Sequence, residues 1–204
     1  MKSISFLLTL FLVASIAFIA QQQPSAPKNA AQSPASGHRL AQSMQVKLDH
    51  IQQNGARANP DQTPTVMTEE EVNDYVAAGG IKLPQGVKKL SFQGRTGVVT
   101  TFLLVDFDEI KQGQHTSNPL LSMFNGTHNV AVEGDAAGSG GKGKVHVRMV
   151  TIDGIEVPRI ALEYFVSKYI TPKYPNTGLD STFELPNKID TATVGYHKLT
   201  VTQK

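Results

Sequence analysis

The side chains that most often carry out catalysis are scattered through this sequence. Its six histidines are His38, His50, His115, His128, His146 and His197. None stands at the His-x-x-x-His spacing that puts two imidazoles on one helix face, although His128 and His146 fall on neighbouring predicted strands. The chain has no cysteine, which excludes disulfides, thiolate metal sites and a cysteine nucleophile. Since no nucleophile–base pairing is visible, we expect no enzyme activity, no metal and no cofactor.

Two acidic segments at first suggest cation binding. Thr68–Glu71 places a hydroxyl three residues before a carboxylate, which is the capping-box pattern of a helix N-terminus. We therefore favour a helix start over a metal site. Asp106–Glu109 is interpreted in the same way, with Asp108 capping a short helical turn over Glu109–Lys111. The remaining oxygen ligands of a calcium loop are missing there.

A glycine-rich stretch resembles a phosphate-binding loop. Gly138–Val145 nearly matches G-x-x-x-x-G-K-[S/T], but Val145 stands where magnesium binding needs a hydroxyl. A strand pattern follows the lysine, whereas a phosphate loop leads into a helix. We therefore predict a hairpin loop over Gly134–Gly143, between strands His128–Glu133 and Lys144–Asp153.

Further strand patterns lie on either side of this hairpin. Val87–Gln93 and Gly97–Phe107 form one predicted hairpin, and Ile189–Val194 and Lys198–Thr202 form another. The strand Gly97–Phe107 has apolar side chains at both odd and even positions. A strand of that kind is covered on both faces, by a rolled sheet or by a second apolar guest. About six strands are expected in all.

One helix pattern is apolar around most of its girth. It starts after Pro158, whose fixed φ suits a helix start, and it runs to Ile170 with a narrow polar stripe at Arg159, Glu163 and Ser167. An ordinary surface helix has a single apolar face, so this helix needs cover on several sides. We predict an α+β fold in which a curved antiparallel sheet wraps around this long apolar helix, preceded by short N-terminal helices.

The first part of the chain is predicted to be a leader and a tether. Residues 1–20 contain a lysine followed by an apolar run, which predicts a signal peptide or, if uncleaved, an N-terminal anchor. Residues 21–64 are of low complexity, apart from a short amphipathic helix over 38–53, and residues 65–204 form a single domain. We expect the protein in the periplasm or outside the cell, or held at the inner membrane by its leader. The net charge of +2 gives no polybasic surface for nucleic acid.

The second half of the chain resembles a known family. Its pattern runs from Val150 through Val157-Pro158 into the apolar helix, and then through Leu185-Pro186 to a closing hairpin. This is similar to the LmeA-like family of exported bacterial phospholipid-binding proteins, which are related to the tubular lipid-binding (TULIP-like) folds. The resemblance implies a curved sheet around a long helix, and lipid binding in the cell envelope without catalysis.

The two-faced strand and the apolar helix are together predicted to line an apolar lipid cavity. The expected lining residues are Phe102, Leu104, Leu162, Phe165, Val166 and Tyr169. Burial of an acyl chain there would contribute about 0.8 kcal/mol per CH₂. The expected partner is a lipid or a membrane surface. The alternative is a structural or adaptor domain with a dry core that binds an envelope protein.

Overall fold

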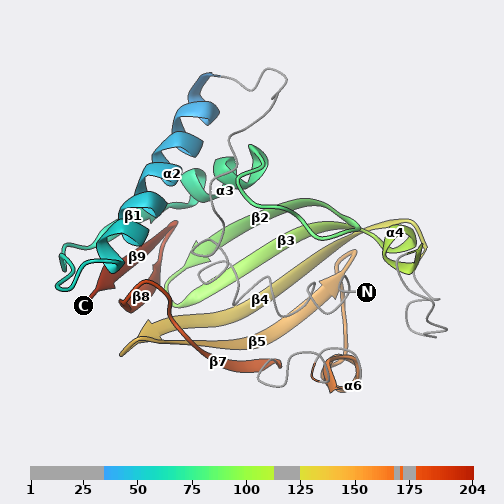
Figure 1. Cartoon of the computed structure of the whole chain (residues 1–204). Helices are drawn as coiled ribbons and strands as arrows, with labels where there is room; N and C mark the ends of the chain where they lie inside the picture. The colour runs from blue at the N-terminus through green and yellow to red at the C-terminus, as the bar shows by residue number, and fades with distance from the viewer. Residues whose placement is uncertain (1–34, 113–124, 168–170, 172–177) are drawn as a thin grey trace.

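An antiparallel β-sheet forms most of the protein. The computed structural model describes residues 35–112, 125–167, 171 and 178–204. In these residues nine strands belong to one sheet, more than the sequence predicts, and helices lie at its two ends (Figure 1). The α+β class predicted from the sequence is therefore confirmed.

The strands are β1 (Thr65–Thr68), β2 (Val87–Arg95), β3 (Val98–Asp106), β4 (Thr127–Ser139), β5 (Lys142–Ile152), β6 (Ile155–Glu156), β7 (Asp180–Glu184), β8 (Ile189–Gly195) and β9 (Lys198–Gln203). The helices are α2 (Ala35–Gly55), α3 (Glu69–Ala77), α4 (Phe107–Gln112) and α6 (Arg159–Phe165). Figure 1 shows α2 and α3 at one end of the sheet and α4 and α6 at the other. The three predicted hairpins correspond to β2–β3, β4–β5 and β8–β9.

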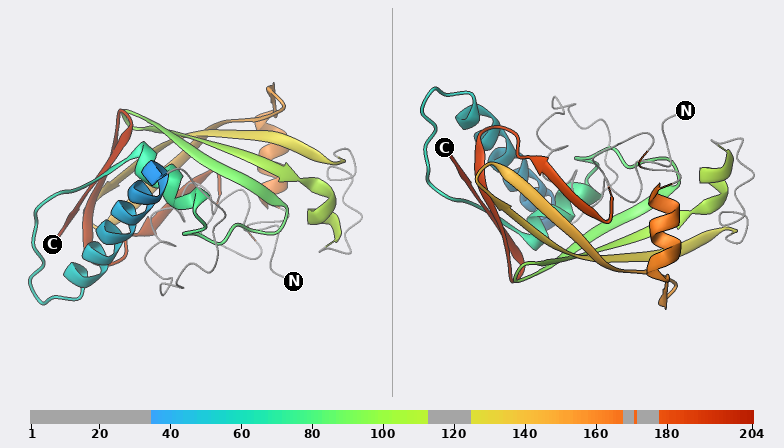
Figure 2. Two further views of the ribbon diagram at one scale, coloured as in Figure 1. Left: turned by 90° about the horizontal axis from the view of Figure 1, so that it is seen from above. Right: turned by 90° about the horizontal axis from the view of Figure 1, so that it is seen from below.

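The sheet divides at β4, which changes partner along its length. β3 pairs with its first part, from Thr127 to Asp135, and β8 pairs with Ala137 and Gly138. β5 occupies the other side of β4, and the far edge of β5 carries β6 and β7. The main path across the sheet is β1-β9-β8-β4-β3-β2. The sheet is open and twisted (Figure 2), and it does not wrap around a helix as predicted.

The glycine loop predicted over Gly134–Gly143 is mostly strand. β4 and β5 continue through it, and the turn itself consists of Gly140 and Gly141, with φ values of 62° and 77°. The flanking glycines serve packing instead. A Cβ on Gly143 would lie 2.4 Å from the ring of Phe183, so glycine here makes room for an aromatic side chain of β7. The glycine content of the sequence did not distinguish the glycines that form the turn from those that make room for packing.

The acidic segment at Thr68 starts a helix, as predicted. Thr68 Oγ1 accepts a hydrogen bond from Glu71 N (3.2 Å), and Glu71 Oε2 accepts one from Thr68 N (2.8 Å), which completes the capping box. Glu71 is buried and also accepts bonds from Ser43 Oγ and Lys47 Nζ of α2, both at 2.6 Å. Burial alone would raise the pKa of Glu71, but these hydrogen bonds hold it below its ordinary value. One carboxylate therefore caps α3 and also fixes α2 against it.

The short helix after β3 is capped by Asp106, and not by Asp108 as predicted. Asp106 Oδ1 accepts hydrogen bonds from Asp108 N (3.0 Å) and Glu109 N (3.1 Å) at the start of α4. Asp108 instead accepts a bond from Gly126 N (2.8 Å). Both aspartates precede helical residues, so the sequence did not distinguish them.

The helix α2 extends beyond its predicted bounds and is fixed at its C-terminal end by buried amides. Asn54 Nδ2 donates to Gln203 Oε1 (2.9 Å), and Gln203 Nε2 donates to Ile51 O (2.8 Å). These bonds pair polar groups that would be costly to bury alone, and they join α2 to β9. No helix in the described part of the chain combines the length and hydropathy needed to cross a membrane.

The inner face of the sheet carries the main hydrophobic core. Its buried members on β2 to β5 include Leu90, Leu103, Val105, Val130, Val132, Val145, Val147 and Val150. Leu162 of α6 and Val166, which directly follows α6, also belong to this cluster. A second cluster lies between α2, β1, β8 and β9, and the side chains of Phe183 and Leu199 contact both.

The long apolar helix expected to need cover on several sides is not observed. α6 spans Arg159–Phe165, beside one end of the sheet (Figure 2), and residues 168–170 lie outside the described part of the chain. Ile160 and Tyr164 are 77% and 50% exposed, whereas Leu162 and Val166 are buried. Only one side of α6 therefore packs on the sheet. Single exposed apolar side chains are common on protein surfaces, so they did not require the cover that the sequence suggested.

A buried hydroxyl lies on the inner face of β3. Thr101 is fully buried, and its Oγ1 has no hydrogen-bond partner among the described residues. Burial of an unpaired hydroxyl costs about 1–3 kcal/mol. This position is therefore a weak point of the core.

We predict that Thr101→Val stabilises the protein, because valine keeps the shape of threonine and removes the unpaired hydroxyl. Urea denaturation should show a free energy of unfolding that is higher by about 1 kcal/mol. Thr101→Ser is the matched control: it keeps the hydroxyl, loses a buried methyl and should lower the free energy of unfolding. A Thr101→Val variant less stable than the natural protein would contradict this account.

Candidate functional site

An open groove lies on the outer face of the sheet, opposite the core. Its volume is about 500 Å³, within the roughly 300–1,000 Å³ of ligand-binding pockets. It crosses β2, β3 and β4 and ends at the turn after β5. Its lining residues are Lys89, Ser91, Phe102, Leu103, Leu104, Asn129, Val130, Ala131, Thr151 and Gly154.

The strand register explains why a groove forms here. Phe102 stands opposite Ser91 on β2 and Ala131 on β4, so small side chains flank a large aromatic one. Leu104 lies on the same face, because side chains two residues apart in a strand point to the same side. Phe102 is 43% exposed, and Leu104 is half-buried. Phe102 and Leu104 therefore form an apolar ridge that is accessible to solvent, and a shallow depression lies beside it over the smaller side chains.

Of the six predicted lining residues, the four whose side chains the structure describes are divided between two faces of the sheet. Phe102 and Leu104 line the outer groove. Leu162 and Val166 are buried in the core on the inner face, at 8% and 5% exposure. The side chain of Phe165, and the whole of Tyr169, lie outside the described part of the chain. The groove and α6 therefore do not share one cavity in the described residues.

Sequence reasoning missed the polar residues of the groove. Lys89 stands opposite Leu104, and Leu104 stands opposite Asn129. Ser91 and Thr151 belong to the neighbouring row, on either side of Phe102 and Ala131. Alternation along each strand shows that these residues face outward, but only the cross-strand register places them around the same apolar centre.

A histidine–aspartate pair fixes one end of the groove. His128 Nδ1 lies 2.5 Å from Asp153 Oδ2, and His128 Nε2 lies 3.0 Å from Asn125 O. Both partners are acceptors, so the protonated imidazole, which donates from both ring nitrogens, is the form that satisfies both contacts. The hydrogen bond with Asp153 raises the pKa of His128, and the same bond lowers the pKa of Asp153. Asp153 Oδ1 also accepts from Asn129 N (2.9 Å), which ties the turn to a groove residue.

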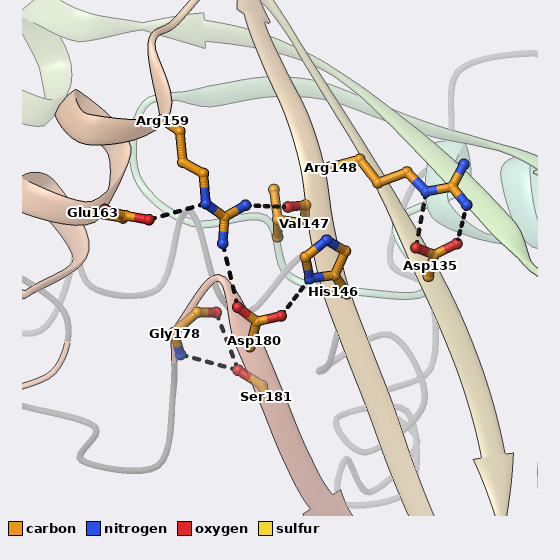
Figure 3. A network of polar contacts seen from close by, with 9 residues as sticks. All are labelled: Asp135, His146, Val147, Arg148, Arg159, Glu163, Gly178, Asp180 and Ser181. Carbon is orange, nitrogen blue, oxygen red and sulfur yellow. Dashed lines mark hydrogen bonds and ion pairs between the residues drawn. The ribbon is translucent and has the colours of Figure 1, made fainter.

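A second polar network holds α6 against the sheet (Figure 3). Arg159 donates to Glu163 Oε1 (2.9 Å), to Asp180 Oδ2 (3.3 Å) and to Val147 O (3.3 Å). The other oxygen of Asp180 bonds His146 Nδ1. The bond from His146 and the charge of Arg159 lower the pKa of Asp180. This network joins α6, β5 and β7.

Among the described residues, the serine nearest to either histidine pair is engaged with the backbone. Ser181 lies next to Asp180, but its hydroxyl accepts from Gly178 N (2.9 Å) and donates to Gly178 O (3.1 Å). His128 and His146, expected on neighbouring strands, each bond a separate aspartate. The described residues contain no group of three or more His, Asp or Glu side chains placed to bind a metal ion.

Comparison with known proteins adds no relative. No protein-family model, curated protein or solved structure matches the chain. The resemblance to the LmeA-like family therefore stays a prediction.

The His128–Asp153 pair predicts a pH-dependent stability. The pKa of His128 is raised above 6.5 in the folded protein, so its contribution is complete below pH 6.5 and is lost as the pH rises through the raised value. The pKa of Asp153 is lowered below 3.8, so its contribution is present above pH 3.8 and is lost as the pH falls through the lowered value. The stabilisation from this pair is therefore greatest between pH 3.8 and pH 6.5.

We predict that His128→Gln removes the loss of stability that begins above pH 6.5, where the raised pKa of His128 lies. Urea denaturation at a series of pH values checks this. His50→Gln, on an exposed position of α2, should keep the natural pH profile. The same alkaline decline in His128→Gln as in the natural protein would show that another group is responsible.

Proposed function

We propose that this protein is an exported, non-catalytic protein of the cell envelope that binds a lipid through an apolar surface. The observation that carries the proposal is the half-exposed pair Phe102 and Leu104 at the centre of the outer groove. Exposed aromatic side chains in a concave surface are typical of binding sites. The leader predicted over residues 1–20 supports export to the periplasm or beyond, or retention at the inner membrane.

The chemistry around the groove favours an acyl chain as the ligand. Phe102, Leu104 and Ala131 form a continuous apolar strip across β3 and β4, and contact with such a strip requires no specific hydrogen bond. Each CH₂ removed from water would contribute up to about 0.8 kcal/mol. The groove is open, so a bound chain would keep part of its surface in water and bind reversibly.

Native mass spectrometry tests the proposal directly. The full chain is expressed in a bacterium, and the protein is purified from the envelope fraction without detergent. The expected result is a mass excess equal to one or two phospholipids, lost on organic extraction. A bare polypeptide that stays bare after incubation with phospholipid vesicles would overturn lipid binding and favour the adaptor alternative.

We predict that Phe102→Ser weakens binding of a fluorescent fatty acid while leaving the fold intact. Loss of a half-exposed aromatic contact of roughly 1 kcal/mol corresponds to about a fivefold rise in Kd. Tyr196→Ser, which removes an aromatic residue 70% exposed in the β8–β9 turn, should leave Kd unchanged. Circular dichroism checks that both variants are folded, and equal Kd values for the two folded variants would exclude the groove as the site.

A further inference from the structure

We propose that the outer groove selects a phospholipid with an anionic headgroup, and that Lys89 and Ser91 of β2 bind its phosphate. This inference rests on the lipid-binding function proposed above and adds the headgroup class and the orientation of the bound molecule. Lys89 is the only charged side chain among the described residues that line the groove. It is exposed and makes no ion pair or hydrogen bond with another described residue.

The neighbouring basic side chains differ from Lys89, because each of them already forms an ion pair with a carboxylate. On the outer face of the sheet or beside that face, Lys88 pairs with Glu109, Arg95 with Glu133 (2.6 Å) and Arg148 with Asp135 (2.5 Å). Two carboxylates beside the groove are also occupied, and the exposed Glu156 stands opposite Thr151, on the side of the groove away from β2. Asp106 lies 4.0 Å from Lys88, and Asp153 bonds His128. The ammonium group of Lys89 therefore has no counter-ion in the described part of the chain and is available to an anionic ligand.

The register gives the ligand a direction. Lys89 and Ser91 are two residues apart on β2, so both side chains point outward at the same edge of the groove. They provide an ammonium and a hydroxyl, both of which donate hydrogen bonds to phosphate oxygens. Next to them, toward β4, lie Leu104 and Phe102, followed by Ala131. A phosphate at the β2 edge thus places an acyl chain across the apolar strip.

The charge of Lys89 matters because the apolar strip alone does not distinguish headgroups. An exposed ion pair contributes modestly and is screened by salt, so we expect preference rather than strict selection. Dissociation constants for the anionic and zwitterionic lipids should differ about three- to fivefold at low ionic strength, and the difference should shrink as salt is added.

The test uses isothermal titration of the full protein with dihexanoyl phosphatidylglycerol and dihexanoyl phosphatidylcholine, below their micelle concentrations. These lipids share their acyl chains and differ in net charge. Glycerol phosphate, which lacks acyl chains, is a third ligand. The expected result is tighter binding of phosphatidylglycerol than of phosphatidylcholine, and no measurable binding of glycerol phosphate.

Lys89→Ala should abolish the preference, because it weakens binding of the anionic phosphatidylglycerol more than binding of the zwitterionic phosphatidylcholine, whose phosphate also contacts Lys89. Lys144→Ala is the matched control, because Lys144 is also exposed on the outward side of the sheet but lies outside the groove; this variant should keep the preference. Lys89→Glu should reverse it and favour an alkyltrimethylammonium amphiphile, a change that a merely structural role of Lys89 would not produce.

The remaining outcomes separate the two proposals. Equal binding of both lipids by the natural protein, unaltered in Lys89→Ala, would overturn headgroup selection and leave lipid binding in place. Equal loss of preference in Lys144→Ala would assign it to the general surface charge and overturn the role of Lys89. Binding of glycerol phosphate alone would indicate a site for free phosphate esters. Absence of binding by every ligand would overturn both proposals.

Discussion

Burial of one face of the sheet is the constraint on which the rest of this structure depends. The side chains of β2 to β5 that point inward form a single apolar cluster, and Leu162, Val166 and Leu179 complete it. The hydrophobic effect requires those faces to be covered, but it places no such demand on the outer face of an antiparallel sheet. The outer face is therefore the surface on which apolar residues can remain accessible for binding.

Polar contacts determine where the surrounding elements attach to this sheet. Glu71 joins α3 to α2, Asn54 and Gln203 join α2 to β9, and Arg159 joins α6 to β5 and β7. Each of these groups has at least one partner on a different element, so the contact fixes a relative position as well as pairing a polar group. The outward-facing groove residues on β2 and β3 are, by contrast, positioned by backbone pairing between the strands.

The sequence predicted the local features well and the tertiary arrangement less well. The capping box at Thr68 and the three hairpins were predictable, because their signals lie within a few residues of one another. The pattern after Pro158 wrongly predicted a helix covered on several sides, because an apolar side chain can be exposed. The glycine stretch before Lys144 wrongly predicted a long loop, because a glycine can serve packing rather than a turn. Phe102 and Leu104 were predicted from their pattern to line a binding site, and both line the groove. Lys89 and Ser91 were not, because their proximity to Phe102 arises from strand register, which periodicity does not determine.

The pairing of β1 with β9 has a consequence for how the chain folds. Thr65 stands opposite Val201, and Thr68 opposite Lys198, so contacts that complete one edge of the sheet join segments separated by nearly the whole domain. Such distant contacts cost loop-closure entropy before they contribute stability, and they slow folding. The β2–β3 and β4–β5 hairpins have no such requirement, since their strands are adjacent in sequence. The centre of the sheet is therefore expected to form early, and the end that carries α2 and α3 to close last.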